Sequence, residues 1–391
     1  MCCCCPSAIS ALFCLWVQSG CNKGSVAGAL TFFPPEPALY EFERHDKSGR
    51  VLGHNEEAPL DEETNENAAN DEDNSSVGEI RSPDRSGPFE APATHGQTKE
   101  KIKSPFEQLA DQAVERRKRS KMRIARDSRD KKAGVSYRLL LDPRLQVPPH
   151  EDGSIHALKI PSPGGVYVAA VLYSVPPSRR SERTRIIIYS HGNATDIGAM
   201  FPLQIVMAHS LDCDVLVYDY SGYGESGGVP EEASTYRDID AVYEYICREV
   251  VNQRTEKIIL YGQSVGSGPC CYLAAKVAKQ KKALGGMILH SPFTSGMRVL
   301  TPSRLLACLD IYPNIDRIKK IRCPCMLIHG YLDQEVDISH GQDLHKAVPD
   351  EYKRDPWWVA DRGHNDITDG PGKLAEYIRR LRGFLESLER L

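Results

Sequence analysis

The chain has 391 residues, of which 41% are hydrophobic and 26% are charged, with 49 Lys and Arg against 53 Asp and Glu. This length allows one large domain or two of ordinary size. The formal net charge of −4 argues against a dedicated nucleic-acid-binding protein, which would be strongly basic. Thirteen cysteines are too few for a small disulfide-rich scaffold. The seven cysteines from Cys213 to Cys325 form no paired array of zinc-site spacing, so we expect no metal and no cofactor.

Residues 1–44 begin with four consecutive cysteines at positions 2–5, followed by a short apolar stretch over 9–17. No Lys or Arg precedes this stretch, as a secretory signal would require, and it is shorter than the about 20 apolar residues that span a bilayer. Cys2 excludes N-myristoylation, which needs glycine at that position. Clustered thiols beside apolar residues are typical of multiple S-palmitoylation, which anchors a protein stably. A metal-binding or uncleaved hydrophobic leader is the alternative.

Residues 45–134 have the composition of a disordered linker, acidic at first and then basic. Residues 41–98 hold 15 Asp and Glu against 5 Lys and Arg, whereas residues 99–132 hold 13 Lys and Arg against 6 Asp and Glu. Few apolar residues are available there to form a core. The basic run 116–121 fits a solvated linker, a contact with an anionic membrane, or a nuclear-localisation or RNA-binding patch.

From about residue 135 to 391 the pattern is that of a catalytic domain. The alternating run 166–173 predicts an antiparallel strand near a sheet edge. Short continuous apolar runs then alternate with helical stretches, which predicts a doubly wound α/β domain with helices on both faces of a mostly parallel sheet. The expected strands are 186–189, 215–218, 258–261, 287–290, 326–329 and 357–360, and the expected helices include 231–250, 266–279, 338–347 and 372–390.

The candidate nucleophile is Ser264, because residues 262–266 read G-Q-S-V-G between an expected strand and an expected helix. The G-x-S-x-G motif in that context is the nucleophile elbow of the α/β-hydrolase fold. Its glycines permit a tight turn that exposes the serine hydroxyl above the sheet. About 30 residues separate the strand that ends at His290 from the one that starts near Cys325, which leaves no room for a large lid.

A serine hydroxyl needs a base, and the base needs an acid that orients it. In this fold the chain order is serine, acid, histidine. Asp333 follows the strand 326–329 and His364 follows the last strand, so we assign them as acid and base. Asp337 is the competing acid, although it suits the start of the next helix as a cap. The other candidate histidines are His329, His340 and His345.

The oxyanion hole is expected to use the backbone N–H of Val265 and one N–H from the loop 190–194, for which Asn193 is the best candidate. Two other motifs overlap this loop. Residues 193–195 match a glycosylation sequon, and His191 with Asp196 match an acyltransferase-like H-x₄-D pattern. We expect no glycosylation, because an active-site loop of a cytosolic protein would not be modified, and we interpret the His-Gly pair as part of the loop structure.

Together these motifs resemble the α/β-hydrolase domain-containing protein 17 family. The resemblance covers about 25–44 and nearly all of 135–391, and the matching runs are 33–37 (FPPEP), 190–194 (SHGNA), 218–224 (YDYSGYG), 260–264 (LYGQS), 290–292 (HSP), 294–298 (TSGMR) and 363–366 (GHND). It implies a serine hydrolase that removes palmitate from cysteines of other proteins through the triad Ser264, Asp333 and His364. It also implies an anchor palmitoylated at Cys2, Cys3, Cys4, Cys5 and Cys14.

The expected protein is therefore a palmitoyl-protein thioesterase held by lipid at the cytoplasmic face of the plasma or endosomal membrane. Its partners would be S-acylated membrane-associated proteins and membrane lipids, and no nucleic acid. A lysophospholipase or other lipid esterase is the alternative enzyme, because the same triad cleaves oxygen esters. A lipid-tethered scaffold with an inactive hydrolase fold is the alternative outside enzymes.

Overall fold

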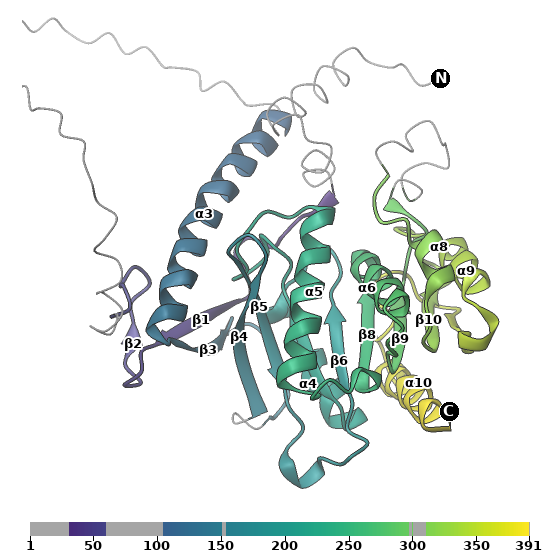
Figure 1. The fold of residues 1–391 in the computed structure, drawn as a ribbon. Coiled ribbons are helices and arrows are strands. Elements are labelled where there is room, and N and C mark those ends of the chain that lie inside the picture. The colour runs from purple at the N-terminus through teal and green to yellow at the C-terminus, as the bar shows by residue number, and fades with distance from the viewer. Residues whose placement is uncertain (1–30, 60–104, 151–153, 297–298, 300–309, 391) are drawn as a thin grey trace, which may run out of the picture.

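The computed structural model describes residues 31–59, 105–150, 154–296, 299 and 310–390. Figure 1 shows a central sheet flanked by helices, with the long helix α3 (Pro105–Ala133) lying along one side. The expected acylation sites at positions 2–5 and 14 lie outside the described residues. Among the described residues, no helix is both long and apolar enough to cross a membrane.

The central sheet has eight strands in the order β11-β10-β9-β8-β6-β7-β5-β4. Strand β5 pairs antiparallel with both β4 and β7, and the other neighbouring strands run parallel. This mostly parallel sheet confirms the α/β-hydrolase fold, and the antiparallel strand predicted near one edge is β5. The strands are β4 (Ile155–Ser162), β5 (Val166–Tyr173), β6 (Ile186–Ser190), β7 (Asp214–Tyr218), β8 (Ile258–Gln263), β9 (Gly286–His290), β10 (Cys325–Gly330) and β11 (Trp357–Val359).

The central strands are apolar on both faces because each face packs against its own layer of helices. Along β6, Ile186 and Ile188 belong to one hydrophobic core, whereas Ile187 and Tyr189 belong to the other. Successive side chains of a strand point to opposite faces, so a continuous apolar run is required when both faces are covered. The first core includes residues of α5 and α6, and the second includes residues of α4 and α10.

The structure contains the four helices that the sequence predicts, and α4 and the short α8 are additional. The helices are α4 (Ile197–Leu211), α5 (Glu232–Glu249), α6 (Ser267–Lys279), α8 (Asn314–Arg317), α9 (Ile338–Ala347) and α10 (Lys373–Ser387). Short 3₁₀ turns are η3 (Pro177–Arg179), η4 (Thr255–Lys257), η5 (Ser264–Gly266), η7 (Ile318–Lys320), η8 (Asp350–Tyr352) and η9 (Leu388–Arg390). Between β9 and β10, the described chain includes the short α8 and η7.

A second, smaller sheet joins the N-terminal residues to the catalytic domain. Strand β1 (Tyr40–His45) pairs antiparallel with β2 (Val51–Leu52) and with β3 (Ser136–Leu141). Tyr40 and Phe42 of β1 are buried in the second core. The folded domain therefore includes residues on the N-terminal side of the boundary at 135 that the sequence suggests.

Helix α3 corrects the expectation of a disordered linker over 45–134, which is wrong for β2 and for residues 105–133. The inner face of α3 is held by buried charges. Lys159 of β4 is only 3% exposed, and its Nζ lies 3.0 Å from Oδ2 of Asp127 and 3.6 Å from Oε2 of Glu225. The two carboxylates offset part of the cost of removing the ammonium from water, and burial still lowers the pKa of Lys159 below its usual value.

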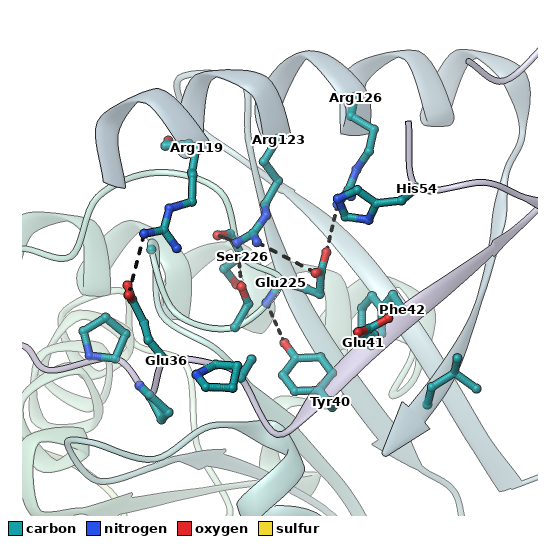
Figure 2. Close-up of a pocket in the computed structure, with 18 of the residues that line it drawn as sticks. Glu36, Tyr40, Glu41, Phe42, His54, Arg119, Arg123, Arg126, Glu225 and Ser226 are labelled. Carbon is teal, nitrogen blue, oxygen red and sulfur yellow. Dashed lines mark hydrogen bonds and ion pairs between the residues drawn. The ribbon is translucent and has the colours of Figure 1, made fainter. Parts of the chain in front are cut away.

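Arginines of α3 strengthen this attachment, and Figure 2 shows them with their partners. These residues line a cavity of about 430 Å³ beside the helix. Arg126 donates to Glu225 at 2.8 Å, and Arg123 donates to the backbone carbonyls of Gly224 and Ser226. One turn further along the helix, Asp130 forms a buried ion pair with Arg44 of β1. The charged residues that suggest a solvated segment thus include the groups that dock it.

Candidate active site

Ser264 sits in a strained turn directly after β8. Its φ is +51°, in the left-handed region that residues with a side chain rarely adopt. The serine opens η5, which leads into α6. Its side chain is half-buried, so the hydroxyl is available above the carboxyl end of the sheet.

The two glycines of G-x-S-x-G are required by close backbone contacts. A Cβ at Gly262 would lie 2.6 Å from the carbonyl oxygen of Gly266, and a Cβ at Gly266 would lie 2.0 Å from that of Ser190. Both distances are shorter than any real Cβ contact. The glycines therefore allow the turn to close on itself and on the end of β6, as the motif predicts.

His364 lies within hydrogen-bond distance of Ser264 and Asp333. Its Nε2 is 2.9 Å from Oγ of Ser264, and its Nδ1 is 2.7 Å from Oδ2 of Asp333. A carboxylate only accepts, so Nδ1 carries the proton and Nε2 accepts the hydroxyl proton of Ser264. The structure thus brings together the three residues that the sequence analysis assigned, from loops that follow β8, β10 and β11.

The carboxylate of Asp333 is buried and fully engaged. Its Oδ1 accepts the backbone N–H groups of Glu335 and Val336 at 2.9 and 2.8 Å, while Oδ2 faces His364 and lies 3.1 Å from Nε2 of His329. Burial alone would raise its pKa, but the hydrogen bonds from His329, His364 and Val336 lower the pKa of Asp333 well below its usual range. The group is therefore an anion throughout the physiological pH range.

Gly330 allows the loop of His364 to approach that of Asp333. A Cβ at Gly330 would lie 2.2 Å from the carbonyl oxygen of Arg362. The backbone N–H of Leu332 donates to this same carbonyl at 2.8 Å, and that of Tyr331 donates to Val359. These backbone contacts explain how two loops about 30 residues apart in the sequence hold the side chains of Asp333 and His364 next to each other.

The competing candidates have other partners. Asp337 caps α9 by accepting the backbone N–H of Ser339, as its position suggests. His340 lies beside Thr294, and Nε2 of His345 lies 3.1 Å from the carbonyl of Arg354. Asp196 caps α4, and its H-x₄-D partner His191 faces Asp219 instead.

The loop expected to form the oxyanion hole lies beside the nucleophile. A Cβ at Gly192 would lie 3.9 Å from Cβ of Ser264. The side chain of Asn193 is occupied elsewhere, because its Oδ1 accepts from the backbone of Phe33 and from the hydroxyl of Tyr223, and its Nδ2 donates to the carbonyl of Thr31. Residues Thr31 and Phe33 therefore hold this loop in place. Because the side chain of Asn193 is engaged in these contacts, its backbone N–H is the group left to bind a substrate.

The chain is similar in sequence to known proteins. Residues 181–315 match the family model described as serine aminopeptidase, S33. Over 200 residues the chain is 40% identical to human alpha/beta hydrolase domain-containing protein 17B, a match that spans 51% of this chain and 65% of that protein. It is also 40% identical over 201 residues to the alpha/beta hydrolase domain-containing protein aho-3 of Caenorhabditis elegans, covering 51% and 57% of the two chains.

The chain is a homologue of the alpha/beta hydrolase domain-containing 17 proteins.

The match to these 17-type relatives is partial, since the aligned segment spans less than two thirds of each relative's length. Among solved structures, a hyperthermophilic esterase from the archaeon Pyrobaculum calidifontis aligns with a TM-score of 0.50 and 14% identity over 62% of this chain and 85% of its own. At that identity the likeness supports the α/β-hydrolase fold alone. The protein thus has the α/β-hydrolase fold.

Two buried histidines beside the candidate triad were not assigned from the sequence. His329 supports Asp333, as described above. His290, at the end of β9, lies 2.9 Å from the hydroxyl of Tyr261, and burial together with the charges of His364 and His329 lowers its pKa to about 3. It is therefore neutral near pH 7. Their positions at strand ends are the one signal in the sequence that points to the site.

The described cysteines do not take part in the site. Cys213, Cys247, Cys270, Cys271, Cys323 and Cys325 are all free and buried. Burial raises the pKa of Cys270 to about 12, so its thiol stays protonated and unreactive. Within the described residues, no group of three or more His, Cys, Asp or Glu side chains is arranged to hold a metal ion.

Proposed function

We propose that this protein is a serine hydrolase that cleaves the thioester between a fatty acyl chain and a protein cysteine. The observation that carries the proposal is the continuous hydrogen-bonded chain from Ser264 through His364 to Asp333, with Ser264 held in a left-handed turn. A structural serine has no need of that strain or of an oriented base. The same chain argues against the inactive scaffold.

In the first half of the reaction, His364 takes the hydroxyl proton as Oγ of Ser264 attacks the thioester carbonyl. The imidazolium that forms is stabilised by the anionic carboxylate of Asp333, which also holds the tautomer in place. The carbonyl oxygen gains negative charge, for which the backbone N–H groups of Val265 and Asn193 are the proposed donors. The C–S bond then breaks, the cysteine leaves with the proton from His364, and the acyl group stays on Ser264.

In the second half, a water molecule attacks the acyl-enzyme. His364 accepts a proton from this water, and the hydroxide adds to the acyl carbonyl. The bond to Oγ breaks, Ser264 recovers its proton from His364, and the free fatty acid leaves. The net reaction is hydrolysis of a thioester to a fatty acid and a thiol.

Exposed apolar side chains near the site support a fatty acyl substrate. Tyr331 and Leu332 are 50% and 60% exposed and immediately precede Asp333. Phe33, whose backbone holds the Asn193 loop, is 49% exposed. Apolar groups gathered at a surface commonly mark contacts with apolar ligands or lipid.

The location of the enzyme is part of this proposal. The N-terminal cysteines at positions 2–5 and Cys14 would carry palmitate and hold the protein at the cytoplasmic face of the plasma or endosomal membrane, where S-acylated proteins are its substrates. Palmitoylation is tested by hydroxylamine-sensitive labelling with an alkyne fatty acid. Replacement of the cysteines at positions 2–5 by serine is expected to remove most of the label and to release the protein from membranes.

The function is tested with an S-palmitoylated peptide and, in parallel, with a lysophospholipid. Wild-type protein is expected to release fatty acid from the peptide, and Ser264→Ala is expected to lose this activity together with labelling by a fluorophosphonate probe. Ser178→Ala, at an exposed serine of η3 away from the catalytic turn, serves as the matched control. A clear preference for the lysophospholipid would replace the thioesterase with a lipid esterase, and undiminished labelling of Ser264→Ala would remove Ser264 from the mechanism.

A further inference from the structure

A groove of about 1180 Å³ lies where the C-terminal end of α6 meets the turn η7. Figure 1 shows α6 on the far side of α5 from α3, next to α8. The described residues that line the groove are basic apart from three alanines and Tyr272, and no Asp or Glu is among them. The exposed basic residues are Lys279, Lys281, Lys282, Lys319, Lys320 and Arg322.

Most of these cations have no neighbouring anion. Lys276 lies 2.7 Å from Asp240, and Lys319 lies 3.4 Å from Asp316. For the remaining exposed cations of the groove, no carboxylate of the described chain lies within ion-pair distance. Like charges gathered without counter-charges repel one another and cost free energy in the isolated protein. An anion bound in the groove would offset that cost.

Helix stabilisation explains only part of this cluster. Lys276 and Lys279 occupy the last turn of α6, where cations interact favourably with the helix dipole. Lys281, however, follows the helix with a φ of +59°, where glycine or asparagine is favoured. Lys320 and Arg322 come from a different segment. Lys281 is the left-handed residue of the cap that ends α6, because the N–H groups of Lys281 and Lys282 donate to the carbonyls of Ala278 and Val277. The backbone of this cap does not require a positive side chain, and Lys320 and Arg322 take no part in it.

We propose that this groove binds an acidic segment of a partner protein, an extended stretch rich in Asp and Glu. Cations contributed by two separate segments line a recess, and the small alanine side chains between them leave room for a peptide. Carboxylates along an extended chain would meet lysines from both segments at once, which gives complementarity that a single surface pair lacks.

Two other classes of polyanion fit the groove less well. Binding of single-stranded nucleic acid relies on exposed aromatic faces for stacking. The one aromatic ring of the groove, Tyr272, is stacked on Tyr236 with a centroid distance of 4.3 Å and lies under the guanidinium of Arg317. A planar bilayer contacts convex surfaces more readily than a recess.

The groove is remote from the nucleophile. Helix α6 begins directly after the turn of Ser264 and has 13 residues, so its far end lies roughly 20 Å away at 1.5 Å per residue. A bound segment would therefore leave the active site open. The proposal does not depend on the reaction proposed above.

The test is fluorescence anisotropy of the full-length protein with a fluorescein-labelled glutamate-rich peptide. The triple variant Lys281→Glu, Lys282→Glu, Lys320→Glu is expected to weaken binding by about tenfold or more, and binding to wild type is expected to weaken as salt rises. If the charge-reversal variant does not fold, the variant with glutamine at the same three positions is used instead, and it is also expected to bind the peptide more weakly than wild type.

The matched control reverses three exposed cations outside the groove, Arg248→Glu, Lys346→Glu and Arg379→Glu, and changes the net charge equally. It is expected to retain binding. Both triple variants should hydrolyse a small ester at the wild-type rate. Equal loss in the two variants, no binding by wild type, or stronger competition by an RNA oligonucleotide or by phosphatidylserine vesicles would overturn the proposal.

Discussion

The triad and the attachment of α3 both bury carboxylates, but their partners differ in kind. Asp333 faces two histidines and two backbone N–H groups, whereas Asp127 and Glu225 face lysine and arginine. A histidine can gain and lose a proton near neutral pH, and a lysine or arginine there does not. The first arrangement is suited to moving a proton and the second to holding a helix.

The comparison predicts that a change at the triad affects activity far more than stability. Asp333→Asn keeps the shape of the side chain but removes its charge and favours the wrong tautomer of His364. We expect kcat for hydrolysis of a thioester or a small ester to fall by about 10⁴-fold. Circular dichroism and thermal unfolding should stay close to wild type. A variant with near wild-type kcat would show that another acid orients His364.

A change at the α3 attachment should affect stability far more than activity. Lys159→Met leaves Asp127 and Glu225 without the cation between them, so we expect the free energy of unfolding to fall by about 3–5 kcal/mol, measured by urea denaturation. Activity of the folded fraction at low temperature should persist. The double variant Lys159→Met, Asp127→Leu removes the ammonium and one of its two carboxylates and leaves Glu225 paired with Arg126, so it should recover much of the loss. Full stability of the single variant would mean that these charges do not hold α3.

The α3 attachment should also make the stability of the protein depend on pH in the acidic range. Burial alone would raise the pKa of Glu225, but Lys159, Arg123 and Arg126 lower it from 4.5 to about 2. Its folded pKa is depressed, so its contribution of about 3 kcal/mol is present above the unfolded value and is lost as pH falls from about 4.5 to 2.

Glu225→Gln should therefore be less stable than wild type at pH 7, and the difference should shrink over that acidic range. Urea denaturation at a series of pH values measures it. A constant difference between the two proteins at all pH values would contradict the assignment of this charge to the α3 attachment.

The smallest expected effect distinguishes two neighbouring aspartates. Asp337→Ala removes only the cap of α9, so we expect a loss of about 1 kcal/mol in unfolding free energy and unchanged kcat. Its contrast with Asp333→Asn in the same assays checks which aspartate is the acid. A large loss of kcat in Asp337→Ala would reverse the assignment.

Much of the catalytic domain was predictable because its signals are local. An apolar run such as that of β6 indicates a buried strand, and G-x-S-x-G after β8 indicates a tight turn. Neither indication depends on residues that are distant in the sequence. In a parallel sheet the loops after the strands meet at one edge. The positions of Ser264, Asp333 and His364 along the chain therefore imply their proximity in space.

The sequence by itself thus determined the α/β order of the domain and the three residues of its candidate site. Only the tertiary structure decided that α3 packs on the domain, that the segment from Thr31 to Phe33 clamps Asn193, and that the ends of α6 and η7 form one basic groove. The physical reason is that the position of a charged residue in the sequence does not show which opposite charge it will contact in the folded protein. Asp127 and Glu225 acquire their roles only when chain folding brings both carboxylates within 4 Å of the Lys159 ammonium.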